Sequence, residues 1–199
     1  MEAVDALTEK ALIRRERKWV SKVLTSGVWS SDWAGVASGP TGNQFVQWDQ
    51  SAATPFTFIR QRSRAIQLVT GKKPNVLVLS NDVYDTLIQN DEIIDLYRYV
   101  EGGLVSEQNL REVFDVERIV VPMAFYNTAK EGSANSFAWT APTKTAWLGY
   151  IAPRASLQTP TAVSMFAWQG LLNGVANAQG GVITRGRDDR AYTDWVRIS

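Results

Sequence analysis

The segment from Trp48 to Tyr99 constrains the fold more than any other part of the chain. Pro55 fits the first turn of a helix, where its missing N–H is not needed, and Gly71 can adopt the left-handed conformation that ends a helix. A helix is therefore expected from about residue 55 to residue 70. The short apolar run at 75–79 is too short for a helix and predicts a buried strand, after which two short helices are expected.

A charged helix is expected over residues 2–24. Apolar residues recur there at helical spacing, but five charged residues follow one another at 14–18. Because a helix spreads such a run around its circumference, the segment is expected on a surface. The simplest interpretation is a solvated helix face. The alternative is contact with nucleic acid or a neighbouring subunit through Arg14, Arg15, Arg17 and Lys18.

The second half of the chain is β-rich, which makes the expected fold class α+β. The pair Gly102 and Gly103 marks an expected boundary between two subdomains. Residues 26–47 are rich in glycine and are expected to form an extended loop anchored by aromatic side chains. The helix at 55–70 should pack Phe56, Ile59, Ile66 and Val69 on the strand that follows it. Strands are expected at 116–121, 137–140, 145–151, 163–168, 182–187 and 192–198.

The composition argues against most enzyme classes. None of the 199 residues is histidine or cysteine, which excludes imidazole-based triads, thiolate nucleophiles and zinc sites of the usual ligands. No phosphate-binding or dinucleotide-binding motif is present, so neither a cofactor nor catalysis is expected, although a serine-lysine pair stays open. The net charge of +1 gives no global attraction to DNA, and no apolar run is long enough to span a membrane.

A cluster of charges lies near the end of the chain. Neighbouring carboxylates on a strand point to opposite faces, so Asp188 and Asp189 would be poorly placed there to share a metal ion, whereas in a turn they could share one. Ion pairing within or between subunits is the preferred interpretation. The residues concerned are Arg185, Arg187, Asp188, Asp189 and Arg190.

Several motifs, taken in order, resemble tailed-bacteriophage (Caudovirales-type) major capsid proteins. They are the Trp48-Asp49 turn, the helix ending in Thr70-Gly71, the Pro74-Asn75 strand start, DVYDTLIQNDEI, VERIVVPMAFYNTAKEGSANSFAW and GRDDRAYTDWVRIS. The resemblance covers nearly the whole chain and corresponds to the C-terminal part of such proteins, starting near their long spine helix. It implies a peripheral subdomain with the spine helix and a sheet, and an axial subdomain with a mixed sheet and short helices. Residues 1–101 would begin the peripheral subdomain, 102–179 would form the axial one, and 180–199 would return as strands of the first.

The same resemblance implies a late structural protein that assembles with itself. Pentamers and hexamers would close an icosahedral shell around double-stranded DNA, with portal, scaffold or decoration proteins as further partners. The expected location is the virion, and the host cytoplasm during assembly. The alternative is a stand-alone β-rich module that binds a ligand or carbohydrate, in which Trp139, Trp147 and Trp168 would be exposed platforms.

Overall fold

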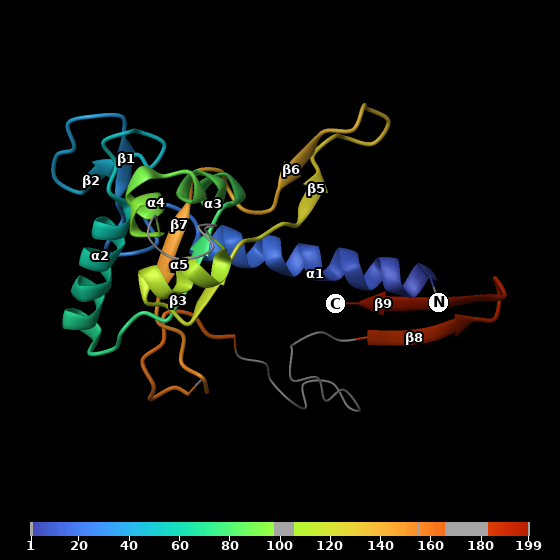
Figure 1. Ribbon diagram of the computed structural model, residues 1–199. Coiled ribbons are helices and arrows are strands. Elements are labelled where there is room, and N and C mark those ends of the chain that lie inside the picture. The colour runs from blue at the N-terminus through green and yellow to red at the C-terminus, as the bar shows by residue number, and fades with distance from the viewer. Residues whose placement is uncertain (1, 98–105, 155, 166–182, 199) are drawn as a thin grey trace.

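The computed structural model describes residues 2–97, 106–154, 156–165 and 183–198 (Figure 1). Its helices are α1 (Glu2–Val23), α2 (Pro55–Thr70), α3 (Asn81–Ile88), α4 (Asp91–Tyr97) and α5 (Glu107–Phe114). Its strands are β1 (Ala34–Val36), β2 (Gln44–Val46), β3 (Val76–Leu79), β4 (Arg118–Val120), β5 (Phe125–Asn127), β6 (Phe137–Trp139), β7 (Ala146–Gly149), β8 (Ile183–Asp188) and β9 (Thr193–Ile198). The fold is therefore α+β, as the sequence predicts.

A three-stranded sheet of order β4-β3-β7 lies at the centre of the main body. β3 pairs parallel to β4 and antiparallel to β7, and all four of its residues are buried. The core combines buried residues of this sheet, of helices α2 to α5 and of the connection between α5 and β4. These residues are Ile59, Leu77, Leu79, Leu87, Ile93, Leu110, Phe114, Val116 and Ile119. The sheet takes one strand from before residue 101 and two from after it, so both halves of the chain build the same core.

The helix α2 has the limits that its sequence predicts. Pro55 occupies the first turn, and Gly71 follows the helix with φ of 67°, the left-handed conformation that favours glycine. One expectation is wrong. Val69, expected to pack on β3, is 86% exposed, and Leu68 is 88% exposed. Helical spacing identifies a face but not its length, and the last turn of α2 extends beyond the packed core.

The start of β3 is fixed by Asn75, which follows the buried Pro74. The Asn75 N–H donates to the Gly149 carbonyl at 3.1 Å, and the Asn75 carbonyl accepts from the N–H groups of Glu117 and Arg118. The side chain also forms two hydrogen bonds with the backbone of Ile151. Asn75 therefore holds together the ends of all three strands, which gives a physical reason for the proline-asparagine motif.

The glycine-rich segment before α2 is more ordered than its sequence predicts. β1 and β2 form a short parallel pair there, whereas only a loop was expected. The prediction that aromatic residues anchor the segment is confirmed. The Phe45 and Phe58 rings stack with centroids 4.5 Å apart, and the Trp33 ring meets Phe58 edge to face at 5.6 Å.

The long helix α1 connects the main body to a separate hairpin (Figure 1). Its C-terminal end packs Val23 against Val76, Val78 and Trp147 of the sheet. Strands β8 and β9 form an antiparallel hairpin, and β9 contacts α1. Strands β5 and β6 form a ribbon that projects from the body on the side of α1. Of the strand expected at 163–168, residues 163–165 are not in a strand, and the remainder lies outside the described residues.

Candidate functional site

The basic run of α1 has a structural role that its sequence does not reveal. Arg14, Arg15, Arg17 and Lys18 are all exposed, as expected of a surface helix. The Arg17 guanidinium lies over the Tyr126 ring of β5, 3.8 Å from its centroid, a cation-π contact. Next to it, the Thr140 hydroxyl donates to the Glu16 carboxylate at 2.6 Å. Part of this run therefore attaches the β5–β6 ribbon to α1, while contact with DNA or a second subunit stays a prediction.

The charged cluster near the end of the chain lies on the last part of β8 and in the turn that leads to β9. The Asp188 carboxylate accepts hydrogen bonds from the backbone N–H groups of Arg190, at 3.0 Å, and Ala191, at 3.4 Å. The Asp189 carboxylate instead pairs with the Arg187 guanidinium at 3.3 Å. The two carboxylates thus have different partners, in a turn whose geometry Asp188 stabilises. Within the described part of the chain, no group of three acidic, histidine or cysteine side chains is placed to hold a metal ion.

The structure does not bring the two predicted contact regions together. The hairpin lies beside the N-terminal part of α1, whereas the basic run lies in the second half of that helix (Figure 1). Arg185 is exposed on β8, on the hairpin itself. If both regions contact partners, they do so at separate places on the molecule.

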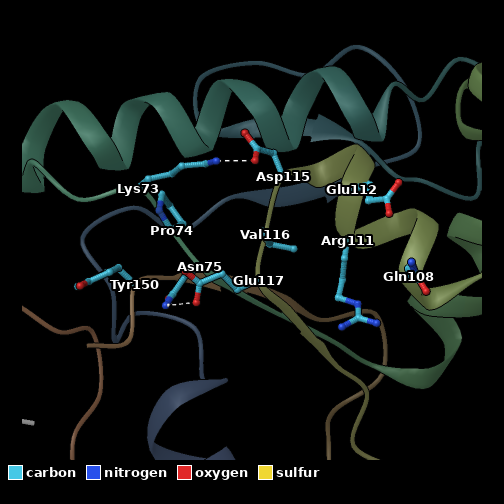
Figure 2. A pocket seen from close by; sticks show the side chains of 10 residues that line it. All are labelled: Lys73, Pro74, Asn75, Gln108, Arg111, Glu112, Asp115, Val116, Glu117 and Tyr150. Atoms are coloured by element: carbon cyan, nitrogen blue, oxygen red, sulfur yellow. Dashed lines mark hydrogen bonds and ion pairs between the residues drawn. The ribbon is translucent and has the colours of Figure 1, made fainter. Parts of the chain in front are cut away.

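A groove of about 650 Å³ runs between α5 and the start of β3 (Figure 2). Its charged side chains largely neutralise one another. Asp115 pairs with Lys73 and with Arg60, at 3.0 Å for the latter, and the hydrogen bond from Lys73 is the main cause of a lowered pKa of the Asp115 carboxyl. Asn75 donates to Glu117 at 3.3 Å. No serine lines the groove, so its described residues offer no nucleophile for the serine-lysine alternative.

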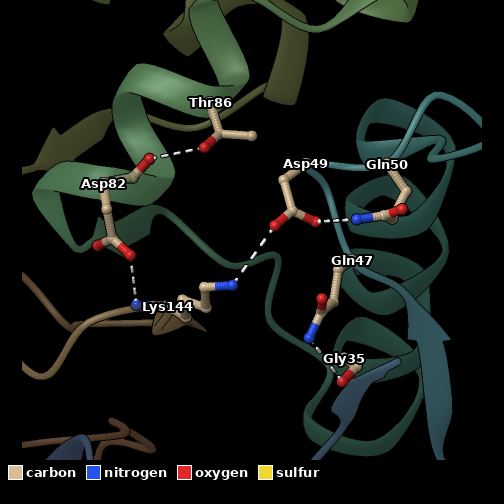
Figure 3. Close-up of polar contacts among 7 residues, drawn as sticks. All are labelled: Gly35, Gln47, Asp49, Gln50, Asp82, Thr86 and Lys144. Atoms are coloured by element: carbon tan, nitrogen blue, oxygen red, sulfur yellow. Dashed lines mark hydrogen bonds and ion pairs between the residues drawn. The ribbon is translucent and has the colours of Figure 1, made fainter. Parts of the chain in front are cut away.

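A second polar cluster joins three segments that are distant in sequence (Figure 3). The Lys144 ammonium lies 3.4 Å from the Asp49 carboxylate, and the Lys144 backbone N–H donates to the Asp82 carboxylate at 2.7 Å. Gln50 donates to Asp49 at 2.9 Å, and this bond, followed by Lys144, lowers the pKa of the Asp49 carboxyl. Asp49 and Asp82 therefore hold the Trp48 turn and the start of α3 near β7.

The tryptophans expected to be platforms in a binding module do not form one surface. Trp147 is 7% exposed and packs in the core beside Trp29, with ring centroids 5.7 Å apart. Trp139 is exposed on the ribbon, and Trp168 lies outside the described residues. The alternative of a binding module requires an exposed Trp147, and the structure contradicts this requirement, because the Trp147 indole packs with Val23, Val76 and Val78 between α1 and the sheet.

The fold is that of a phage-related protein. The structure matches a phage-related protein from Bordetella bronchiseptica RB50 with a TM-score of 0.73, over 99% of this chain and 60% of that one. The two sequences are 20% identical, so this likeness shows a common fold. No protein-family model matches the chain.

The sequence gives the more specific likeness. The chain is 31% identical over 81 residues to the major capsid protein of Burkholderia phage BcepMu. These residues are 41% of this chain and 26% of the relative, so the match spans about a quarter of the relative's length. The resemblance to phage major capsid proteins, predicted from the ordered motifs, is confirmed. In the part of the chain that the structure describes, no helix is long and apolar enough to cross a membrane.

Proposed function

We propose that this chain is part of a phage major capsid protein, whose copies form pentamers and hexamers that close an icosahedral shell around double-stranded DNA. The observation that carries this proposal is the sequence similarity to a protein of that name. The fold shared with a phage-related protein over nearly the whole chain supports it. The role is structural, with the virion as its location and with portal, scaffold or decoration proteins as further partners.

The proposed subdomain layout follows the capsid resemblance. α1 and the β8–β9 hairpin belong to the peripheral subdomain, and the contact between β9 and α1 supports the return of residues 180–199 to it. Residues 102–179 form the axial subdomain. We add β3, which the sequence assigned to the peripheral part, to this proposed axial unit, because β3 lies between β4 and β7. In this layout, α1 belongs to the peripheral subdomain and its C-terminal end reaches the axial one.

The proposal is tested by imaging the purified full-length protein by negative-stain electron microscopy. Closed shells of uniform size, or rings of five and six subunits, would establish assembly. Persistent monomers over a wide range of concentration and salt would refute it. Uniform rings are stronger evidence for assembly than aggregates, because only a contact geometry that closes on itself produces rings.

Contact between α1 and DNA is a separate part of the proposal. Replacing Arg14 and Lys18 by glutamine removes two exposed positive charges without touching the Arg17 contact with Tyr126. If α1 faces the DNA, these particles should lose DNA at a lower salt concentration than the parent, because each phosphate contact contributes to the salt dependence. Arg64→Gln, which removes one exposed positive charge on α2, is the control for loss of a surface charge elsewhere. Equal salt sensitivity of all three particles would refute this contact.

A further inference from the structure

The β5–β6 ribbon has one face bound to the chain and one face exposed. Opposed residues of an antiparallel pair point to the same side, so Phe125, Phe137 and Trp139 share a face, and Tyr126 belongs to the other. The Tyr126 face lies toward α1, where Arg17 covers its ring. On the opposite face, Phe125 is 56%, Phe137 63% and Trp139 47% exposed. The alternation of exposure along both strands follows this two-sided arrangement.

The three exposed aromatic side chains of the ribbon form an apolar surface suited to contact with a partner. The face toward α1 is already covered, but exposed aromatic clusters such as the opposite face mark interaction sites. A buried aromatic residue removes roughly 150–250 Å² from water, so three half-exposed rings present roughly 300 Å² of apolar surface. A stable interface covers about 800 Å² on each partner. The ribbon is therefore large enough to anchor a contact, and too small to hold two subunits together alone.

The end of α2 offers a matching surface on another side of the molecule. Leu68 is 88% and Val69 86% exposed there, and Ala65 precedes them on the same helical face. In Figure 1, α2 and the ribbon lie on opposite sides of the main body. Two unlike surfaces on opposite sides cannot satisfy each other within one chain. Between copies they produce a head-to-tail contact, the kind that forms rings when the rotation closes.

We propose that the aromatic face of the β5–β6 ribbon docks against the end of α2 in a second copy of this chain. The inference rests on the proposed capsid function, from which it takes the identity of the partner, and it adds the two surfaces that meet. Phe137 is the central anchor, since it is the most exposed of the three rings and contacts Phe125 edge to face at 5.6 Å. The small area implies a weak single contact that becomes effective in a ring.

The absence of cysteine from the sequence allows a direct test by cross-linking. Met123→Cys places one thiol beside the aromatic face, and Ala65→Cys places one beside Leu68 and Val69, both at exposed positions. Each variant is incubated alone, and the two are mixed, with a short bismaleimide under assembly conditions. A head-to-tail contact predicts covalent dimers in the mixture and none with either variant alone. Dimers of the Met123→Cys protein with itself would show ribbon-to-ribbon contact and overturn the proposal.

Two substitutions test the anchors from both sides. In the mixed cross-linking experiment, Phe137→Asp in the Met123→Cys protein should lower the dimer yield about tenfold or more, as expected for a central aromatic anchor. Leu68→Asp in the Ala65→Cys protein should do the same, and it leaves the ribbon untouched if Phe137→Asp disturbs its own hairpin. Leu157→Asp, at a residue 92% exposed elsewhere on the surface, is the matched control and should leave the yield unchanged.

The outcomes separate this inference from the proposed function. Rings or shells that form normally with Phe137→Asp and Leu68→Asp would overturn the docking contact and leave the capsid function standing. Loss of rings with both substitutions, but not with Leu157→Asp, would support it. A parent protein that forms neither rings nor shells would refute the proposed function itself, and this inference with it.

Discussion

Replacement of Asn75 by alanine should weaken the whole central sheet, although the residue lies outside its strands. The Asn75 side chain accepts a hydrogen bond from the Ile151 N–H at 2.8 Å and donates one to the Ile151 carbonyl at 3.0 Å. A third, longer bond reaches Glu117 at 3.3 Å. Alanine removes all three and leaves both backbone groups of Ile151 without these partners.

The expected loss of stability follows from these bonds. A neutral hydrogen bond contributes about 1 kcal/mol net, and a buried polar group left without a partner costs about 1–3 kcal/mol. Because Asn75 and Ile151 are only partly buried, water can replace part of what is lost. The two bonds to Ile151 therefore predict a loss of about 2 kcal/mol. For a protein of this size, that lowers the melting temperature by about 4–8 °C.

The assay is urea unfolding followed by tryptophan fluorescence, since Trp147 lies on the neighbouring strand β7 and is buried. Asn43→Ala, at an exposed asparagine before β2, controls for loss of an amide from the surface. A value for Asn75→Ala within about 0.5 kcal/mol of this control, the usual range for surface substitutions, would show that Asn75 does not hold the strands together.

Three further substitutions test other features. Leu87→Ala, at a fully buried position, should cost about 2–5 kcal/mol in urea unfolding, whereas Leu157→Ala at the surface should cost under about 0.5. Gly71→Ala should lower the free energy of unfolding, measured by calorimetry, by about 1–2 kcal/mol. The cause is the φ of 67° alone, since no atom lies near the added Cβ, and no measurable loss would contradict this. Lys73 lowers the pKa of Asp115 below its ordinary value of 3.8, so the pair stabilises the fold above that pH and less as pH falls through the lowered pKa. Asp115→Asn should cost under about 1 kcal/mol at pH 7, because the pair is half exposed, and should flatten the acid side of the stability curve.

The helices were predictable from the sequence because their ends carry local signals. Pro55 and Gly71 delimit α2 by their own backbone preferences, independently of what packs around them. Exposure of Val69 was not predictable in this way, because it depends on where the core ends. The β1–β2 pair was missed for a related reason. Three-residue parallel strands in a glycine-rich segment show no periodicity, and their pairing depends on a contact with α2 through Phe45 and Phe58.

The contact surfaces were only partly predictable. The charged residues of α1 were predicted to lie on a surface and those near the β8–β9 turn to form ion pairs, but the contacts with Tyr126 and Ala191 could not be found from spacing. The aromatic face of the ribbon was missed because apolar residues are normally assigned to the core. The available signal was the alternation of side chains within each strand, which puts Phe125 and Asn127 on the same face of the ribbon as Phe137 and Trp139. It becomes informative only when Tyr126 is known to face α1.

The position of β3 in the middle of its sheet also determines when this protein can fold during synthesis. Both neighbours of β3 are made after it, and Leu77 cannot meet Leu148 until β7 has left the ribosome. In the meantime a fully apolar strand has two open edges, which can pair with other chains. The time taken to translate the residues between β3 and β7 therefore sets how long each nascent chain is open to aggregation. Neighbouring ribosomes on one messenger RNA expose the same strand close together, which favours pairing between two nascent chains. Faster translation of the residues between β3 and β7 shortens this exposure and should therefore raise the yield of soluble protein.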